Sequence, residues 1–135
     1  MMNSTQPLYE ILYISTLAPD TPISAIAKIS RHARAANNTR QVTGLLVFDG
    51  IRFCQQFEGN KQQTILLIEK IKRDSRHTNV EILHHGELAE RRFRTFSTGY
   101  SIVDDVDALE ALEQLEGLPA VQALLKLAPS VDIGP

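Results

Sequence analysis

The amide side chain of Gln55 lies in a stretch where apolar side chains are expected. The run from residue 51 to 58 reads IRFCQQFE and predicts a β-strand, whose side chains point alternately to two faces. The face with the aromatic rings is expected to be buried, and it carries Ile51, Phe53, Gln55 and Phe57. The other face is expected to carry Arg52, Cys54, Gln56 and Glu58. A buried amide needs partners for its donors and acceptors. Gln55 therefore either lies at a sheet end, satisfied by backbone or water, or binds a buried ligand.

Two further polar side chains are expected on surfaces that are otherwise apolar. Tyr13 belongs to a predicted strand at 8–15, and Asn37 lies near the end of a predicted helix. Taken singly, Tyr13 is a core residue with a polar tip, and Asn37 is a helix cap. Together with Gln55 they supply a phenol and two amides beside a cleft between two helices. That set suits a flat heteroaromatic ring with donor and acceptor edges.

The sequence has no signature of catalysis or of metal binding. It has no glycine-rich phosphate loop after the first strand, no nucleophile elbow and no His or Cys pair at ligand spacing. His84 and His85 are adjacent in a predicted strand, so their side chains diverge and a structural pair is favoured over a metal site. Cys54 is the single cysteine and is interpreted as a packing residue. An unpaired cysteine also suits a reducing cytoplasm.

Length and composition predict one domain with a short appendage. The chain has 135 residues, of which 43% are hydrophobic and 22% are charged, as in ordinary globular proteins. No membrane span or secretory signal is recognised, which favours a cytoplasmic protein. Residues 101–135 hold seven acidic residues and one lysine, a net charge of −6 against −2 for the whole chain. The basic bias of the remainder is too weak to predict nucleic-acid binding.

Apolar periodicity predicts five strands and two long helices up to residue 103. Thr21-Pro22 opens the first helix, which is expected to end near Asn37-Asn38. Asp49-Gly50 is the turn of a hairpin within 42–58, and Asn60 caps the second helix. A fourth strand is expected at 80–88 and a fifth within 93–103.

This order predicts an α+β fold, a ferredoxin-like βαββαββ sheet with both helices on one face. The crossovers place the first strand beside the third, so Tyr13 and Gln55 are expected to be neighbours on central strands. Two short helices, at 105–115 and 120–128, are expected to cover the other face and to leave apolar area for a second subunit. The tail PSVDIGP is expected to fray. The predicted division is a main domain of residues 1–103 and a helical extension of 104–135.

Four segments of the sequence form a recognisable set: YIS at 13–15, NNTRQVTGLLVFDGIRFCQQFEG at 37–59, RDSRH at 73–77 and RRFRTF at 91–96. Together they resemble the BLUF family, the blue-light sensors that use flavin. The resemblance implies that FAD lies between the two helices, that Tyr13 is the photochemical tyrosine and that Gln55 lies between it and the flavin. It also implies cofactor contacts from Asn37, Ile29, Ile71, Lys70, Asp74 and Arg76.

In that family, light moves an electron and then a proton from the tyrosine, and the glutamine amide rotates or tautomerises. Three positions depart from the family pattern. Ala36 stands where many members have Asn or His, Phe96 where members often have Trp, and Thr98 where most have Met. Phe96 and Thr98 lie on the fifth strand, which is implied to relay the signal, so the departures bear on the strength of signalling.

The resulting prediction is a non-enzymatic FAD photoreceptor that signals through protein contacts. A homo-oligomer and a further protein partner are expected, without nucleic acid, membrane or metal. No cyclase, phosphodiesterase or DNA-binding module is expected in 135 residues. The alternative is a light-independent ferredoxin-like interaction module. An acylphosphatase-like hydrolase is disfavoured because LAPDTP, rather than a phosphate-binding glycine loop, follows the first strand.

Overall fold

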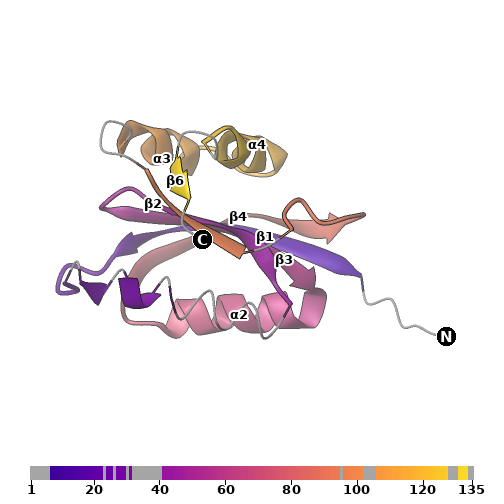
Figure 1. The fold of residues 1–135 in the computed structure, drawn as a ribbon, viewed down its shortest axis with the longest axis horizontal. Coiled ribbons are helices and arrows are strands. Elements are labelled where there is room, and N and C mark those ends of the chain that lie inside the picture. The colour runs from indigo at the N-terminus through magenta and orange to yellow at the C-terminus, as the bar shows by residue number, and fades with distance from the viewer. Residues whose placement is uncertain are drawn as a thin grey trace.

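A six-stranded β-sheet forms the middle layer of the computed structural model, with helices on both faces (Figure 1). The structure describes residues 7–22, 24, 25, 27–29, 31, 41–94, 96–101, 106–127 and 131–133. The strands are β1 (Leu8–Leu17), β2 (Thr43–Phe48), β3 (Arg52–Asn60), β4 (His77–Leu88), β5 (Phe96–Ser101) and β6 (Val131–Ile133). The helices are α2 (Lys61–Arg73), α3 (Val106–Glu113) and α4 (Leu118–Leu127). Residues 25, 27–29 and 31 are also helical, within the first helix that the sequence predicts.

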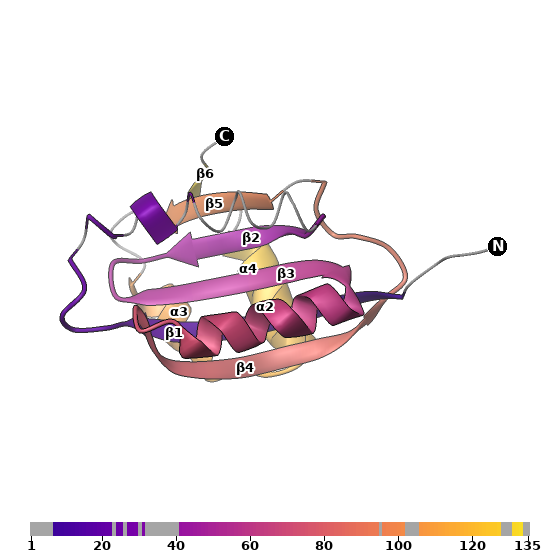
Figure 2. The ribbon, with the colours of Figure 1, turned by 90° about the horizontal axis from the view of Figure 1, so that it is seen from below.

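The strand order is β4-β1-β3-β2-β5-β6, which confirms the ferredoxin-like prediction. β1 is central and pairs antiparallel with both β3 and β4. β2 pairs antiparallel with β3 and parallel with β5. Figure 2 shows α2 lying across β1 and β3. α2 begins as predicted, because the Asn60 side chain accepts hydrogen bonds from the backbone N–H groups of Gln62 and Gln63.

One face of the sheet packs against α2 and Ile29. The α2 side of this face forms a cluster of Ile11, Tyr13, Val42, Phe57, Leu67 and Ile68. Beside it, Ile29 packs with Leu46, Phe48 and Phe53. Both clusters use alternate residues of β3, because every second side chain of a strand points to the same face. The predicted buried face of residues 53–57 is therefore confirmed.

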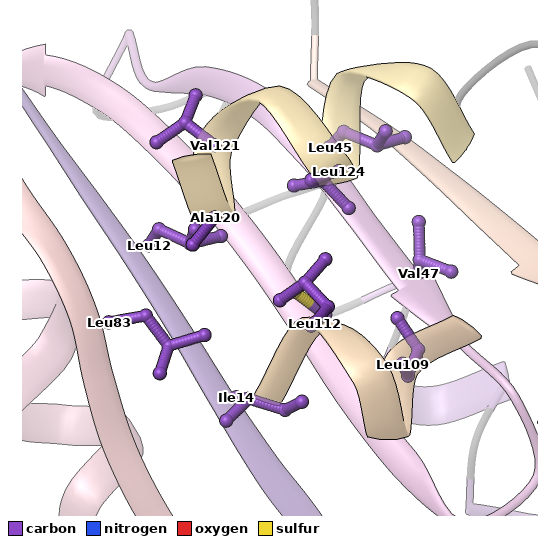
Figure 3. Packing of buried hydrophobic residues seen from close by; sticks show 11 residues of the cluster. Leu12, Ile14, Leu45, Val47, Leu83, Leu109, Leu112, Ala120, Val121 and Leu124 are labelled. Carbon is purple, nitrogen blue, oxygen red and sulfur yellow. The ribbon is translucent and has the colours of Figure 1, made fainter. Parts of the chain in front are cut away.

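The opposite face packs against α3 and α4 (Figure 3). Leu12, Ile14, Leu45 and Val47 are each at most 1% exposed there. Their helical partners include Leu109, Leu112, Val121 and Leu124, as the predicted leucine stripes require. Cys54 is buried in the same cluster, which confirms it as a packing residue. Over these sheet residues the helices leave none of the apolar area that we expected for a second subunit.

Two local expectations are wrong. Ile51 is 48% exposed, because the β2–β3 ladder ends at the pair of Phe48 and Phe53 and residues 49–51 form the connection between the two strands. There the Asp49 carboxylate accepts hydrogen bonds from the backbone N–H groups of Ile51 and Arg52. The described part of the tail is not frayed, since Val131–Ile133 form β6 and pair with β5. The predicted domain division at residues 103 and 104 stays a prediction.

Candidate functional site

Tyr13 and Gln55 lie directly opposite each other on the two central strands. The Tyr13 hydroxyl donates a hydrogen bond to Gln55 Oε1 at 2.5 Å. Both side chains are buried, at 1% and 3% exposure. Burial, followed by the proximity of Cys54 and Asp74, raises the pKa of Tyr13 far above its ordinary value near 10. The phenol is therefore held neutral with its proton directed at the amide oxygen.

Apolar side chains surround this polar pair on both sides. Phe57 approaches the Tyr13 ring edge-on, with 6.2 Å between ring centroids. Ile71, on α2, is partly buried against the cluster that contains Tyr13 and Phe57. Ile29 is 6% exposed in the neighbouring cluster, with Phe53. The aliphatic residues that the resemblance implies for the ring contacts thus lie on the same face as the Tyr13–Gln55 pair.

A second buried polar pair, which the sequence did not predict, lies next to the first. Ser15 Oγ and His77 Nδ1 are 2.8 Å apart, and the His77 ring packs against Phe53 and Tyr13. Burial lowers the pKa of His77, while Asp74 raises it and Arg76 lowers it further. His77 is the last residue of the RDSRH segment, and its place in that segment could have identified it as a site residue.

Three polar residues at or after the end of α2 were predicted to contact the cofactor, and they have different surroundings. Asp74 and Arg76 bind each other, through Arg76 Nε and Nη2 at 2.9 and 2.6 Å from the carboxylate oxygens. This contact, opposed by burial, lowers the pKa of Asp74. The pair lies in the turn between α2 and β4, and His77 is the first residue of β4. Lys70 is exposed in the last turn of α2.

The remaining predicted residues are placed in part or not at all. Asn37 lies outside the described residues, as do the side chains of Phe96 and Thr98. The backbone register nevertheless pairs Thr98 with Leu46, Leu46 with Gln55 and Gln55 with Tyr13. These four residues form one row across β5, β2, β3 and β1. Backbone pairing thus connects Gln55 to β5 through Leu46.

The described residues fit a flat, partly polar ring. They offer a neutral phenol, an amide and apolar side chains on one face of the sheet, with a cation near the end of α2. This donor set is that of a heteroaromatic cofactor site rather than of a metal centre. Within the described ranges, no three His, Cys, Asp or Glu side chains gather as a metal site. None of the described helices is long and apolar enough to span a bilayer.

Comparison with known proteins matches the chain to one family. The family model described as "BLUF: Sensors of blue-light using FAD" matches residues 8–99. The blue light- and temperature-regulated antirepressor BluF of Escherichia coli (strain K12) is 33% identical over 86 residues, which is 64% of this chain and 21% of that protein. The photoactivated adenylate cyclase subunit beta of Euglena longa is 31% identical over 86 residues, which is 64% of this chain and 10% of that protein. The chain therefore aligns with only a small part of either relative.

Solved structures give the same result. BlrB, a BLUF protein in its dark state, superimposes with a TM-score of 0.73 at 25% identity, over 88% of this chain and 92% of that one. Klebsiella pneumoniae BlrP1, in a manganese/cy-diGMP complex at pH 9.0, gives a TM-score of 0.62 at 31% identity, over 66% of this chain and 23% of that one.

Proposed function

The chain belongs to the BLUF family, the sensors of blue light using FAD, and we propose that it is itself a blue-light photoreceptor that binds FAD non-covalently. The observation that carries this proposal is the buried hydrogen bond from Tyr13 to Gln55 Oε1, set between two apolar clusters. The bound flavin would supply absorption of blue light and an acceptor for one electron. Everything else in the switch depends on this chain's own residues.

The flavin-binding residues divide by chemistry. Ile29 and Ile71 would pack against the faces of the ring, and Asn37 would bind its polar edge. Lys70 and the Asp74–Arg76 turn would face the more polar part of the ligand. The support for these assignments is that the described members lie on or beside the α2 face of the sheet.

Tyr13 and Gln55 would form the switch. A phenol with so high a pKa does not ionise alone, so its proton leaves together with, or directly after, an electron. Gln55 Oε1 is in place to receive that proton. The amide would then rotate or tautomerise, the electron and the proton would return to Tyr13, and the hydrogen bond that forms afterwards would differ from the original one. Because an unpaired donor or acceptor is costly in a buried site, this exchange biases the surrounding strands.

The output would be a protein contact rather than a reaction product. The part of the chain that matches the family is a sensor module. We assign it a non-enzymatic role in the cytoplasm, as a homo-oligomer that exposes a light-dependent surface to a further protein. Phe96 and Thr98 would relay the change through β5, and the pairing of Thr98 with Leu46 supports that path.

Purification of the chain tests the proposal. The protein should be yellow and should release FAD on denaturation, with FMN or riboflavin as minor occupants. A colourless protein that no flavin reconstitutes would contradict the photoreceptor assignment. It would favour instead a ferredoxin-like interaction module that works without light.

A further inference from the structure

A cluster of buried charged and polar side chains lies on the sheet face opposite Tyr13 and Gln55. Glu10, Gln56 and Glu58 are exposed by only 1%, 0% and 0%. Glu10 and Glu58 are directly opposite each other in the β1–β3 ladder, where two like charges repel. Two carboxylates survive at such a place only when surrounding donors satisfy them.

The Gln56 amide bridges the two carboxylates. Its Nε2 donates to Glu10 Oε1 and to Glu58 Oε1, each at 3.0 Å. Its Oε1 is buried and finds no hydrogen-bond partner among the described residues. The reversed amide would point that oxygen at both carboxylates, so only one orientation is stable. The cluster therefore holds Gln56 in an arrangement that leaves its Oε1 atom without a donor. A shift of β3 that brought a donor to this oxygen would stabilise the amide.

The same carboxylates hold the connection between β4 and β5. Arg92 donates from Nε and Nη2 to the two oxygens of Glu10, at 2.8 and 3.0 Å. The backbone N–H groups of Arg92 and Phe93 donate to the two oxygens of Glu58, at 3.0 and 2.9 Å. Thr43, the first residue of β2, donates its hydroxyl to Glu58 at 2.7 Å. These buried hydrogen bonds thus connect β1, β2 and β3 with the segment that precedes β5.

The cluster also has contact with both ends of a signalling path. At one end, Gln56 follows Gln55 in β3, so a backbone displacement at Gln55 moves Gln56. At the other end, Phe93 packs against the cluster of apolar residues under α3 and α4. A change that begins at Gln55 can pass through Gln56 and Glu58 to the backbone of Arg92 and Phe93, and from there to β5 and to the helices.

We propose that Glu10, Gln56, Glu58 and Arg92 form the junction that carries a change at Gln55 to β5 and the C-terminal helices, with Gln56 as its positioning residue. The inference rests on the proposed light switch at Tyr13 and Gln55. The row of paired residues that leads to Thr98 is one route, and it stays within the sheet. The junction adds a second route, which crosses from one face of the sheet to the other. The route uses hydrogen bonds on the face away from the proposed flavin site.

Hydrogen exchange of the flavin-loaded full chain, in the dark and under continuous blue light, tests the junction. Gln56→Met keeps the length of the side chain and removes both the bridging donors and the unpaired oxygen. Gln62→Met makes the same change at an exposed position of α2 and is the matched control. All three proteins should show the same light-induced shift in flavin absorption. In peptides that cover 91–101 and 106–127, the light-minus-dark difference in exchange should be present in the unsubstituted protein and in the control, and lost in Gln56→Met.

A full light-minus-dark difference in folded Gln56→Met would overturn the junction and leave the photoreceptor assignment intact. If Gln56→Met does not fold, Arg92→Lys replaces it, since lysine keeps the charge but cannot donate in parallel to both oxygens of Glu10. The same loss is expected there, and a retained difference overturns the proposal. Absence of any absorption shift in the unsubstituted protein would instead remove the photoreceptor assignment, and the junction with it.

Discussion

In the proposed switch, Tyr13 and Gln55 are coupled because neither side chain would change alone. Burial raises the pKa of the phenol, so in this proposal its proton would stay in place until the ring loses an electron. Among the described residues, Gln55 Oε1 accepts the hydrogen bond of that hydroxyl, at 2.5 Å. Once the proton moved, the amide would present a different pattern of donors and acceptors in a site with little access to water. A local change of this kind is costly to leave uncompensated, which is why it can be transmitted.

Strand alternation together with the predicted ferredoxin-like topology was sufficient to predict that Tyr13 and Gln55 are neighbours. It was not sufficient to show that Gln56 and Glu58 are as deeply buried as Gln55, because their hydrogen-bond network includes Arg92 and Phe93, which are distant in the sequence. His77 was missed for a similar reason: its burial depends on the Asp74–Arg76 turn and on Ser15, which are brought together only in three dimensions.

The buried imidazole of His77 predicts a pH-dependent stability. Burial lowers its pKa in the folded protein, whereas the unfolded chain titrates near the ordinary value of 6.5. Between these two values the unfolded state binds more protons, so the free energy of unfolding decreases as the pH falls below about 6.5, by at most about 1.4 kcal/mol per pH unit for one proton. Urea denaturation of the flavin-loaded protein in steps from about pH 7.5 to 5.5 measures this slope.

His77→Gln separates this contribution from those of the other titrating groups. The glutamine has no proton to gain in this range and keeps an amide that can bind Ser15. The variant should therefore show a shallower loss of stability below about pH 6.5. An identical pH profile in the two proteins would show that His77 is not buried in its neutral form.

The C-terminal helices are held to the sheet by apolar packing, and their sequence stripes were a sufficient guide to it. Leu124 on α4 is 1% exposed within the cluster shown in Figure 3. Leu124→Ala should lower the free energy of unfolding by about 2–5 kcal/mol, through lost burial and the cavity that remains. Leu118→Ala, at a residue that is 53% exposed on the same helix, is the control and should change stability by less than about 0.5 kcal/mol. Equal effects of the two substitutions would contradict the packing described for α4.

Two elements could not be predicted because their conformation depends on partners. The hairpin at Asp49-Gly50 matches a two-residue turn in sequence, but the Asp49 carboxylate binds the N–H groups of Ile51 and Arg52 and lengthens the connection. β6 has three residues and no pattern of its own, so only its pairing with β5 makes it a strand. The long strands and α2 were predictable because they carry their own periodicity and cap.

Two outer surfaces of the described part of the molecule carry exposed apolar side chains. Ile65 and Leu66 are 41% and 52% exposed on α2, and Leu115 and Leu118 are 38% and 53% exposed at the opposite layer. α2 carries four cationic residues and one acid, whereas α3 carries three acids and no cation. Apolar residues with opposite surrounding charge on two faces allow copies to pack face to face.

We therefore predict a homo-oligomer whose size or stability changes with light. Sedimentation velocity in the dark and under continuous blue light measures both properties. A strictly monomeric protein in both conditions would refute the oligomer. An oligomer that does not respond to light would leave the assembly in place and show that the signal leaves by another surface.

The light-minus-dark absorption spectrum tests the central claim most directly. The unsubstituted protein should show a reversible red shift of its flavin bands after blue light. Tyr13→Phe removes the donor of the proton, and Gln55→Leu removes the amide that changes state, so each variant should retain flavin and lose the shift. A normal, reversible red shift in Gln55→Leu would contradict the account of the switch given by the Tyr13–Gln55 hydrogen bond.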